Sequence, residues 1–124
     1  MSRLFLILGS LFGFISVAAG AFGAHRLRAS LSAESLAIFE TAARYQMYHA
    51  LALIAVAWIA GRGTATLPAW AGWLFVGGII VFCGSLYLLA LTGVRWLGAV
   101  TPLGGVAFLA GWLCLAAAAW RMPG

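Results

Sequence analysis

The chain has 124 residues, of which 65% are hydrophobic and only 7% are charged. A soluble domain of this length would lack the polar side chains needed to cover its surface, so that class of protein is excluded. The formal net charge of +5 comes from seven arginines against two glutamates, and the arginines are scattered along the chain. Nucleic-acid-binding proteins gather their basic residues on one face, so the sequence predicts no nucleic-acid partner.

Four apolar blocks follow one another along the chain. Residues 4–24, 45–61, 63–94 and 96–120 contain no Asp, Glu, Lys or Arg. A helix needs about 20 apolar residues to cross a hydrocarbon core of about 30 Å, and each block reaches or nearly reaches that length. Only helices and closed barrels satisfy their backbone in lipid, and long runs without alternation exclude a barrel. The sequence therefore predicts an all-α four-helix transmembrane bundle that forms a single membrane domain over residues 1–124.

The first predicted helix covers residues 3–24. Arg3 before an apolar stretch, together with the string Ala19-Gly20-Ala21, imitates a signal peptide and its cleavage site. A signal peptide has an apolar region of about 7 to 15 residues, however, whereas the block that ends at Ala24 is long enough to span on its own. We therefore expect this segment to be retained as a membrane helix.

The three further helices are predicted over residues 33–60, 68–91 and 102–120. Ser32 is suited to cap the first of these, which at 1.5 Å per residue is about 42 Å long and begins outside the hydrocarbon core. Pro68 is expected at the start of the next helix. The pair Thr101-Pro102 is typical of an N-cap followed by the first helical residue, which places the start of the last helix at Pro102.

Small residues recur every three or four positions in the first and last predicted helices. They are Gly9, Gly13, Ser16, Gly20 and Gly23 in the first helix, and Gly104, Ala107, Gly111, Cys114 and Ala118 in the last. Such seams let two helix backbones approach closely in lipid. The pattern predicts close helix packing, either inside the bundle or between two copies of the chain. The other cysteine, Cys83, also lies in an apolar block, and both thiols are expected to behave as small buried hydrophobes.

The arginines do not fix the orientation of the bundle. Four spans place Arg3, Arg62 and Arg121 at one membrane face and Arg26, Arg28, Arg44 and Arg95 at the other. A difference of three against four is too small for the positive-inside rule. The second face nevertheless differs from the first, because most of the polar side chains gather there.

Seven residues at this second face form the candidate site. They are His25, Glu40, Arg44, Tyr45, Gln46, His49 and Thr101. Glu40 and Arg44 are spaced for an ion pair on one helix turn. His49 lies about 7 to 8 Å deeper than Arg44, where an imidazole needs a partner such as His25, Tyr45, Thr101 or a loop carbonyl. We expect His25 and His49 to converge around a glycine-lined gap just below one headgroup layer.

This constellation is compatible with several functions. A hydrogen-bond network that ties the first, second and fourth helices together is the simplest interpretation. Interfacial Arg, His and Tyr also suit a pocket for a lipid headgroup, a quinone or another small amphiphile. Two imidazoles are good ligands for a metal or a haem, but no HxxxH or CxxC motif and no third ligand completes a set, so no metal or cofactor is predicted.

Transport and catalysis fit the sequence less well. Proton-coupled export, as in small multidrug transporters of similar length, needs an acidic group deep in a helix. Glu34 and Glu40 both precede the apolar block that begins at Tyr45. No nucleophile, base and oxyanion donor occur at a recognisable spacing, so an enzyme is not expected.

Four groups of residues resemble a known family. They are Gly20-Ala21-Phe22-Gly23-Ala24-His25, Phe39-Glu40-Thr41 with Arg44-Tyr45-Gln46-Met47-Tyr48-His49, Gly84-Ser85-Leu86-Tyr87, and Thr101-Pro102-Leu103-Gly104-Gly105. In this order they resemble the small YgdD-like membrane proteins of bacteria and their mitochondrial relatives. The resemblance implies a four-helix protein of the bacterial inner membrane with an uncharacterised function and no cofactor. Its expected partners are membrane lipids and either further copies of the chain or a larger membrane complex.

Overall fold

Four long helices make up the part of the chain that the computed structural model describes, residues 1–63 and 66–123, which contains no strand. The first is continuous through α1 (Ser2–Val17), the π-helical segment η1 (Ala18–Gly23) and α2 (Ala24–Leu27), and the second is α3 (Ala33–Ala60). The third passes through α4 (Leu67–Gly78), the π-helical segment η2 (Ile79–Cys83) and α5 (Gly84–Thr92), and the fourth is α6 (Leu97–Trp120). The predicted all-α bundle is confirmed.

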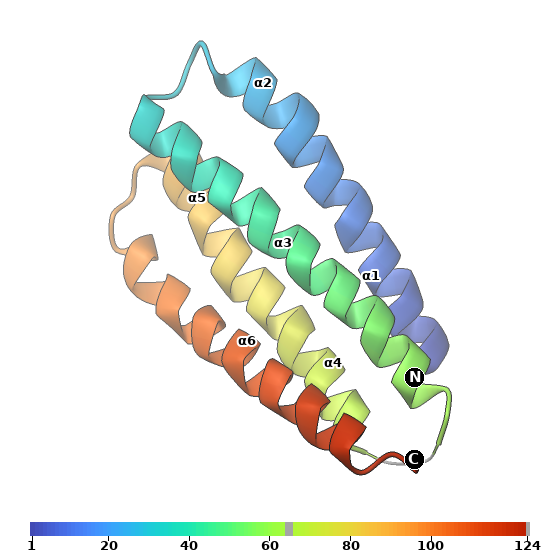
Figure 1. The fold of residues 1–124 in the computed structure, drawn as a ribbon. Coiled ribbons are helices and arrows are strands. Elements are labelled where there is room, and N and C mark those ends of the chain that lie inside the picture. Colours follow the sequence, from blue (N-terminus) through green and yellow to red (C-terminus); the bar gives the residue numbers. More distant parts are fainter. Residues whose placement is uncertain (64–65, 124) are drawn as a thin grey trace.

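The helices run up and down beside one another (Figure 1). α1 packs mainly on α3, and α6 packs mainly on the continuous helix α4–η2–α5. α1 and α6 therefore lie on opposite sides of the bundle. α3 also packs on α4–η2–α5, whereas α3 and α6 touch little. The contact between α3 and α6 is therefore sparse. The few side chains that join these two helices largely determine how they are placed relative to each other.

Three of the four helices are long and apolar enough to cross a membrane: Ser2–Leu27, Leu67–Thr92 and Leu97–Trp120. α3 does not reach that apolarity, because its first half holds the two glutamates and Arg44. It nevertheless lies alongside α1 from end to end, since Ser2 bonds to the Ala57 carbonyl and Gly23 faces Phe39. α3 therefore extends across the same thickness as its neighbour, and its polar side chains reach membrane depth.

The fourth helix begins earlier than the sequence analysis predicted. It starts at Leu97, so Pro102 lies inside α6 and Thr101 is not its N-cap. Thr101 Oγ1 instead donates to the Leu97 carbonyl one turn back. Proline is tolerated here because it falls within the second turn, where only the carbonyl four residues before it loses a helical partner. The predicted cap of α3 is confirmed, since the Ser32 hydroxyl accepts from the Ser35 amide at 3.1 Å.

Both seams of small residues pack inside the bundle. A Cβ at Gly9 would lie 2.9 Å from the Ala50 carbonyl oxygen of α3, and the Ser16 hydroxyl donates to the Ala43 carbonyl. On α6, a Cβ at Gly104 would lie only 2.4 Å from the Phe82 backbone nitrogen in η2. These close approaches supply van der Waals contact that lipid does not replace. Of the two predicted uses of the seams, the structure shows contact within one chain.

Gly104→Ala should destabilise the bundle, because the new methyl group meets backbone rather than a movable side chain. We expect a loss of about 1 to 3 kcal/mol, typical of an overpacked core, seen as a lower unfolding temperature in detergent. The matched control is Gly105→Ala, where the nearest atom of Phe82 would be 3.9 Å away. Alanine favours the helix intrinsically, so the control should be neutral or slightly stabilising. Equal effects of the two substitutions would contradict the close α6–η2 contact.

Candidate functional site

His49 is the centre of the candidate site. Only 4% of this residue is exposed, and it lies in the second half of α3. Its Nδ1 lies 2.6 Å from the Tyr45 carbonyl oxygen, and the Trp112 indole Nε1 of α6 donates to its Nε2 over 3.1 Å. An indole N–H can only donate, so Nε2 accepts and Nδ1 carries the proton. The imidazole is therefore neutral in this arrangement, and both of its nitrogens have protein partners.

Aromatic rings surround His49 on three helices. The Phe108 ring of α6 stacks on the imidazole with centroids 3.5 Å apart and planes 7° apart. Phe75 of α4 contacts the imidazole and meets the Trp112 ring edge to face. Phe82 of η2 packs against both Tyr45 and Phe108. Tyr45, His49, Phe75, Phe82, Phe108 and Trp112 form what we call the aromatic cluster.

A groove of about 800 Å³ opens between α3 and α6 beside the aromatic cluster. Its lining includes Tyr48 and Leu51 of α3 and Val106 and Leu109 of α6, all with exposed side chains. The groove exists because α3 and α6 touch little along their length. Its size lies within the range of about 300 to 1,000 Å³ that is usual for small-molecule sites.

Gln46 forms a second junction, on the other side of α3. It is 3% exposed, its Nε2 donates to the Phe12 carbonyl of α1, and its Oε1 accepts from the Tyr87 hydroxyl of α5. Both bonds are 2.9 Å long. Tyr87 is also held by an edge-to-face contact with Phe39. One amide side chain thus joins three helices.

Thr101 contributes to a third junction rather than to a partnership with His49. Its hydroxyl lies 2.6 Å from that of Ser85 in α5, and either hydroxyl can be the donor in this pair. The Ser85 hydroxyl also lies 3.0 Å from the Phe82 carbonyl oxygen. This pair joins α5 to α6 near the π-helical segment η2. It lies apart from the hydrogen bonds of His49.

The predicted Glu40–Arg44 ion pair does not form. No ion pair occurs among residues 1–63 and 66–123, and the Arg44 guanidinium instead donates to Thr41 Oγ1 over 3.4 Å. Both Glu40 and Arg44 are exposed. An exposed pair gains little Coulomb energy and costs side-chain entropy, so its absence is physically reasonable.

The predicted convergence of His25 and His49 is wrong. His25 is exposed in α2, on the helix that packs against the N-terminal part of α3, where Gly23 faces Phe39. His49 is ten positions beyond Phe39 in α3, which is about 15 Å along the helix axis. His49 also turns toward α6 rather than toward α1 or α2. The two imidazoles therefore cannot share one metal or haem in this arrangement.

His49 lies near mid-height of the bundle. Its stacking partner Phe108 is midway in sequence between Arg95 and Arg121, about 20 Å from each. The stack of His49 on Phe108 is therefore near the middle of α6. Among the described residues, no three His, Cys, Asp or Glu side chains come close enough to hold a metal ion.

Several residues of these junctions were not among the predicted site residues, and Trp112, Tyr87 and Phe108 are three of them. Trp112 and Tyr87 sit in the middle of apolar blocks, although both rings more often occupy the membrane interface. Their depth is the signal that could have identified them, since a buried N–H or O–H needs a partner. Phe108 carries no such signal, because phenylalanine is common throughout membrane helices.

Comparison with known proteins places the chain in a family. Residues 19–105 match the family model described as "Protein of unknown function (DUF423)". The UPF0382 membrane protein SERP0230 of Staphylococcus epidermidis is 50% identical over 122 residues, covering 98% of this chain and 99% of that protein. The UPF0382 membrane protein YwdK of Bacillus subtilis is 45% identical over 121 residues, covering 94% and 96% respectively. No solved structure matches the chain. The chain therefore belongs to the DUF423 family, whose relatives here are named UPF0382 membrane proteins, and it is a helical membrane protein.

Proposed function

We propose that the protein is a non-enzymatic accessory bundle of the membrane, whose buried polar groups fix its fold. One observation carries this proposal: every buried polar side-chain atom in the part of the chain that the structure describes has a hydrogen-bond partner. A catalytic group needs a free lone pair or proton to act on a substrate. Gln46 and His49 already use theirs in hydrogen bonds within the protein.

The proposal extends to what the bundle assembles with. Its exposed surface is largely apolar and suits contact with lipid tails or with the helices of another membrane protein, and membrane lipids are its constant partners. Further copies of the chain or a larger membrane complex are the proposed protein partners. We also propose that the YgdD-like proteins and their mitochondrial relatives have the same four-helix fold. The support for this is that the sequence motifs around His25, His49 and Gly104 resemble theirs.

His49→Ala should lower the stability of the protein without changing what it binds. The substitution removes the imidazole from its stack and leaves the Trp112 N–H unpaired, so we expect a loss of about 2 to 4 kcal/mol. Thermal unfolding in detergent measures this loss. His25→Ala is the matched control, because it removes the same ring from an exposed position. Unchanged stability of the His49 variant would contradict the structural role.

A second candidate function is binding of a quinone or another ring-bearing amphiphile in the groove between α3 and α6. The observation that favours it is the lining, where the rings of Tyr45, Phe82 and Phe108 flank a space of about 800 Å³. Flat rings stack well on aromatic side chains, gaining roughly 0.5 to 1.5 kcal/mol per pair. The bound ring would replace lipid tails in the groove.

Leu109→Trp tests this second function, because the larger side chain fills the groove. If the groove holds a quinone, extracts of the purified wild-type protein should contain it in near-stoichiometric amounts, and the variant should lose it. Leu113→Trp is the control: Leu113 is exposed one turn further along α6 and does not line the groove. Ultraviolet absorption and mass spectrometry of the extracts measure the retained compound. An equal amount in both variants, or none in the wild type, would rule the function out.

A further inference from the structure

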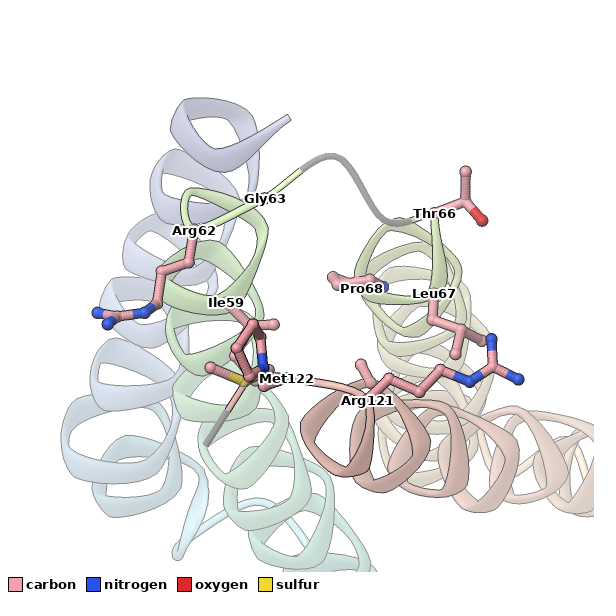
Figure 2. A pocket seen from close by; sticks show the side chains of 10 residues that line it. Ile59, Arg62, Gly63, Thr66, Leu67, Pro68, Arg121 and Met122 are labelled. Carbon is pink, nitrogen blue, oxygen red and sulfur yellow. The ribbon is translucent and has the colours of Figure 1, made fainter.

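A second hollow lies at the end of the bundle where Arg62 and Arg121 are found. It has a volume of about 610 Å³ and is formed by the last turn of α3, the first turn of α4 and the end of α6. Ile59, Pro68 and Ala118 give it an apolar floor. Figure 2 shows the Arg62 and Arg121 side chains extending away from each other to opposite outer sides of the hollow, with Ile59, Pro68 and Met122 between them. The hollow thus combines two cationic edges with an apolar interior.

No acidic side chain of the protein is able to neutralise these arginines. The only two, Glu34 and Glu40, lie in the first half of α3. Arg62 is 22 residues beyond Glu40 in the chain, a separation of about 33 Å along the helix that far exceeds a screening length of about 8 to 10 Å. The two glutamates therefore do not neutralise Arg62 and Arg121.

The hollow also lies at the depth of lipid headgroups. Trp58, Trp70 and Trp120 are strongly exposed at this end of the bundle, and exposed tryptophans prefer the membrane–water interface. The Arg62 guanidinium also lies over the Trp58 ring, with 4.5 Å between the guanidinium carbon and the ring centroid. The anion present at this depth in high concentration is the phosphate of a lipid.

We propose that this hollow binds an anionic phospholipid, with its phosphate attracted by Arg62 and Arg121 and the start of an acyl chain against the apolar floor. Inorganic phosphate offers the same charge but no apolar part, so it would leave Ile59, Pro68 and Ala118 uncovered. A zwitterionic lipid has the apolar part and the phosphate, but the cationic amine of its headgroup balances the charge of that phosphate. Only an anionic lipid matches both features. This inference is independent of the accessory role and of the groove beside His49.

Native mass spectrometry of the full-length protein in detergent, titrated with phosphatidylglycerol, tests the proposal. One lipid should bind, at least about tenfold more tightly than phosphatidylcholine with the same acyl chains. The double variant Arg62→Gln with Arg121→Gln should bind it about 25-fold more weakly, which corresponds to about fivefold for each arginine. Both side chains are exposed, so the fold should persist, and the unfolding temperature checks this.

The matched control is the double variant Arg28→Gln with Arg95→Gln, which removes the same charge from exposed positions at the other end of the bundle. Its affinity for phosphatidylglycerol should stay within about twofold of the wild type, because those arginines are more than a screening length away. Millimolar inorganic phosphate should not displace the lipid. Equal losses in the two double variants, equal binding of the two lipids, or displacement by phosphate would each overturn the proposal.

Discussion

A polar side chain at membrane depth must find its hydrogen-bond partners within the protein, because lipid tails offer none. Gln46 and His49 of α3 both meet this requirement, with partners on opposite sides of the helix. Gln46 bonds to the Phe12 carbonyl of α1 and to Tyr87 of α5, whereas His49 bonds to Trp112 of α6. Each unmade bond would leave a group in hydrocarbon at a cost of several kcal/mol. The positions of α1, α5 and α6 relative to α3 are therefore constrained by two side chains only one turn apart.

Close packing of small residues makes these bonds geometrically accessible. Gly9 lets α1 approach α3, and Gly104 lets α6 approach η2 at Phe82. Between α3 and α6 there is little contact of this kind, and His49 bridges the gap by stacking on Phe108 and accepting from Trp112. The groove is the consequence of this arrangement. One helix pair is joined through side chains at mid-height rather than through backbone contact along its length.

The sequence predicted the fold better than the site. Charge-free blocks identified four helices, because the length needed to cross lipid is a local property of the chain. Thr101-Pro102 misplaced the start of α6, because Pro102 lies in the second turn, where it removes one helical hydrogen bond. The pairing of His25 with His49 failed for a different reason: the two residues lie about 15 Å apart along the helix axis, and the rotation of α3 turns His49 toward α6. That rotation depends on contacts such as Gly23 on Phe39, which no pattern in one sequence reveals.

The bond between His49 and Trp112 is the central claim of this account, and solid-state ¹⁵N NMR of histidine-labelled protein in bilayers measures it directly. The structure predicts a neutral His49 with its proton on Nδ1 and no proton on Nε2. It also predicts through-space transfer of magnetisation between His49 Nε2 and the Trp112 indole N–H. The exposed His25 supplies an internal reference signal with no such transfer. Three results would contradict the claim: a His49 signal with the proton on Nε2, a His49 signal of an imidazolium, or no magnetisation transfer between Trp112 and His49.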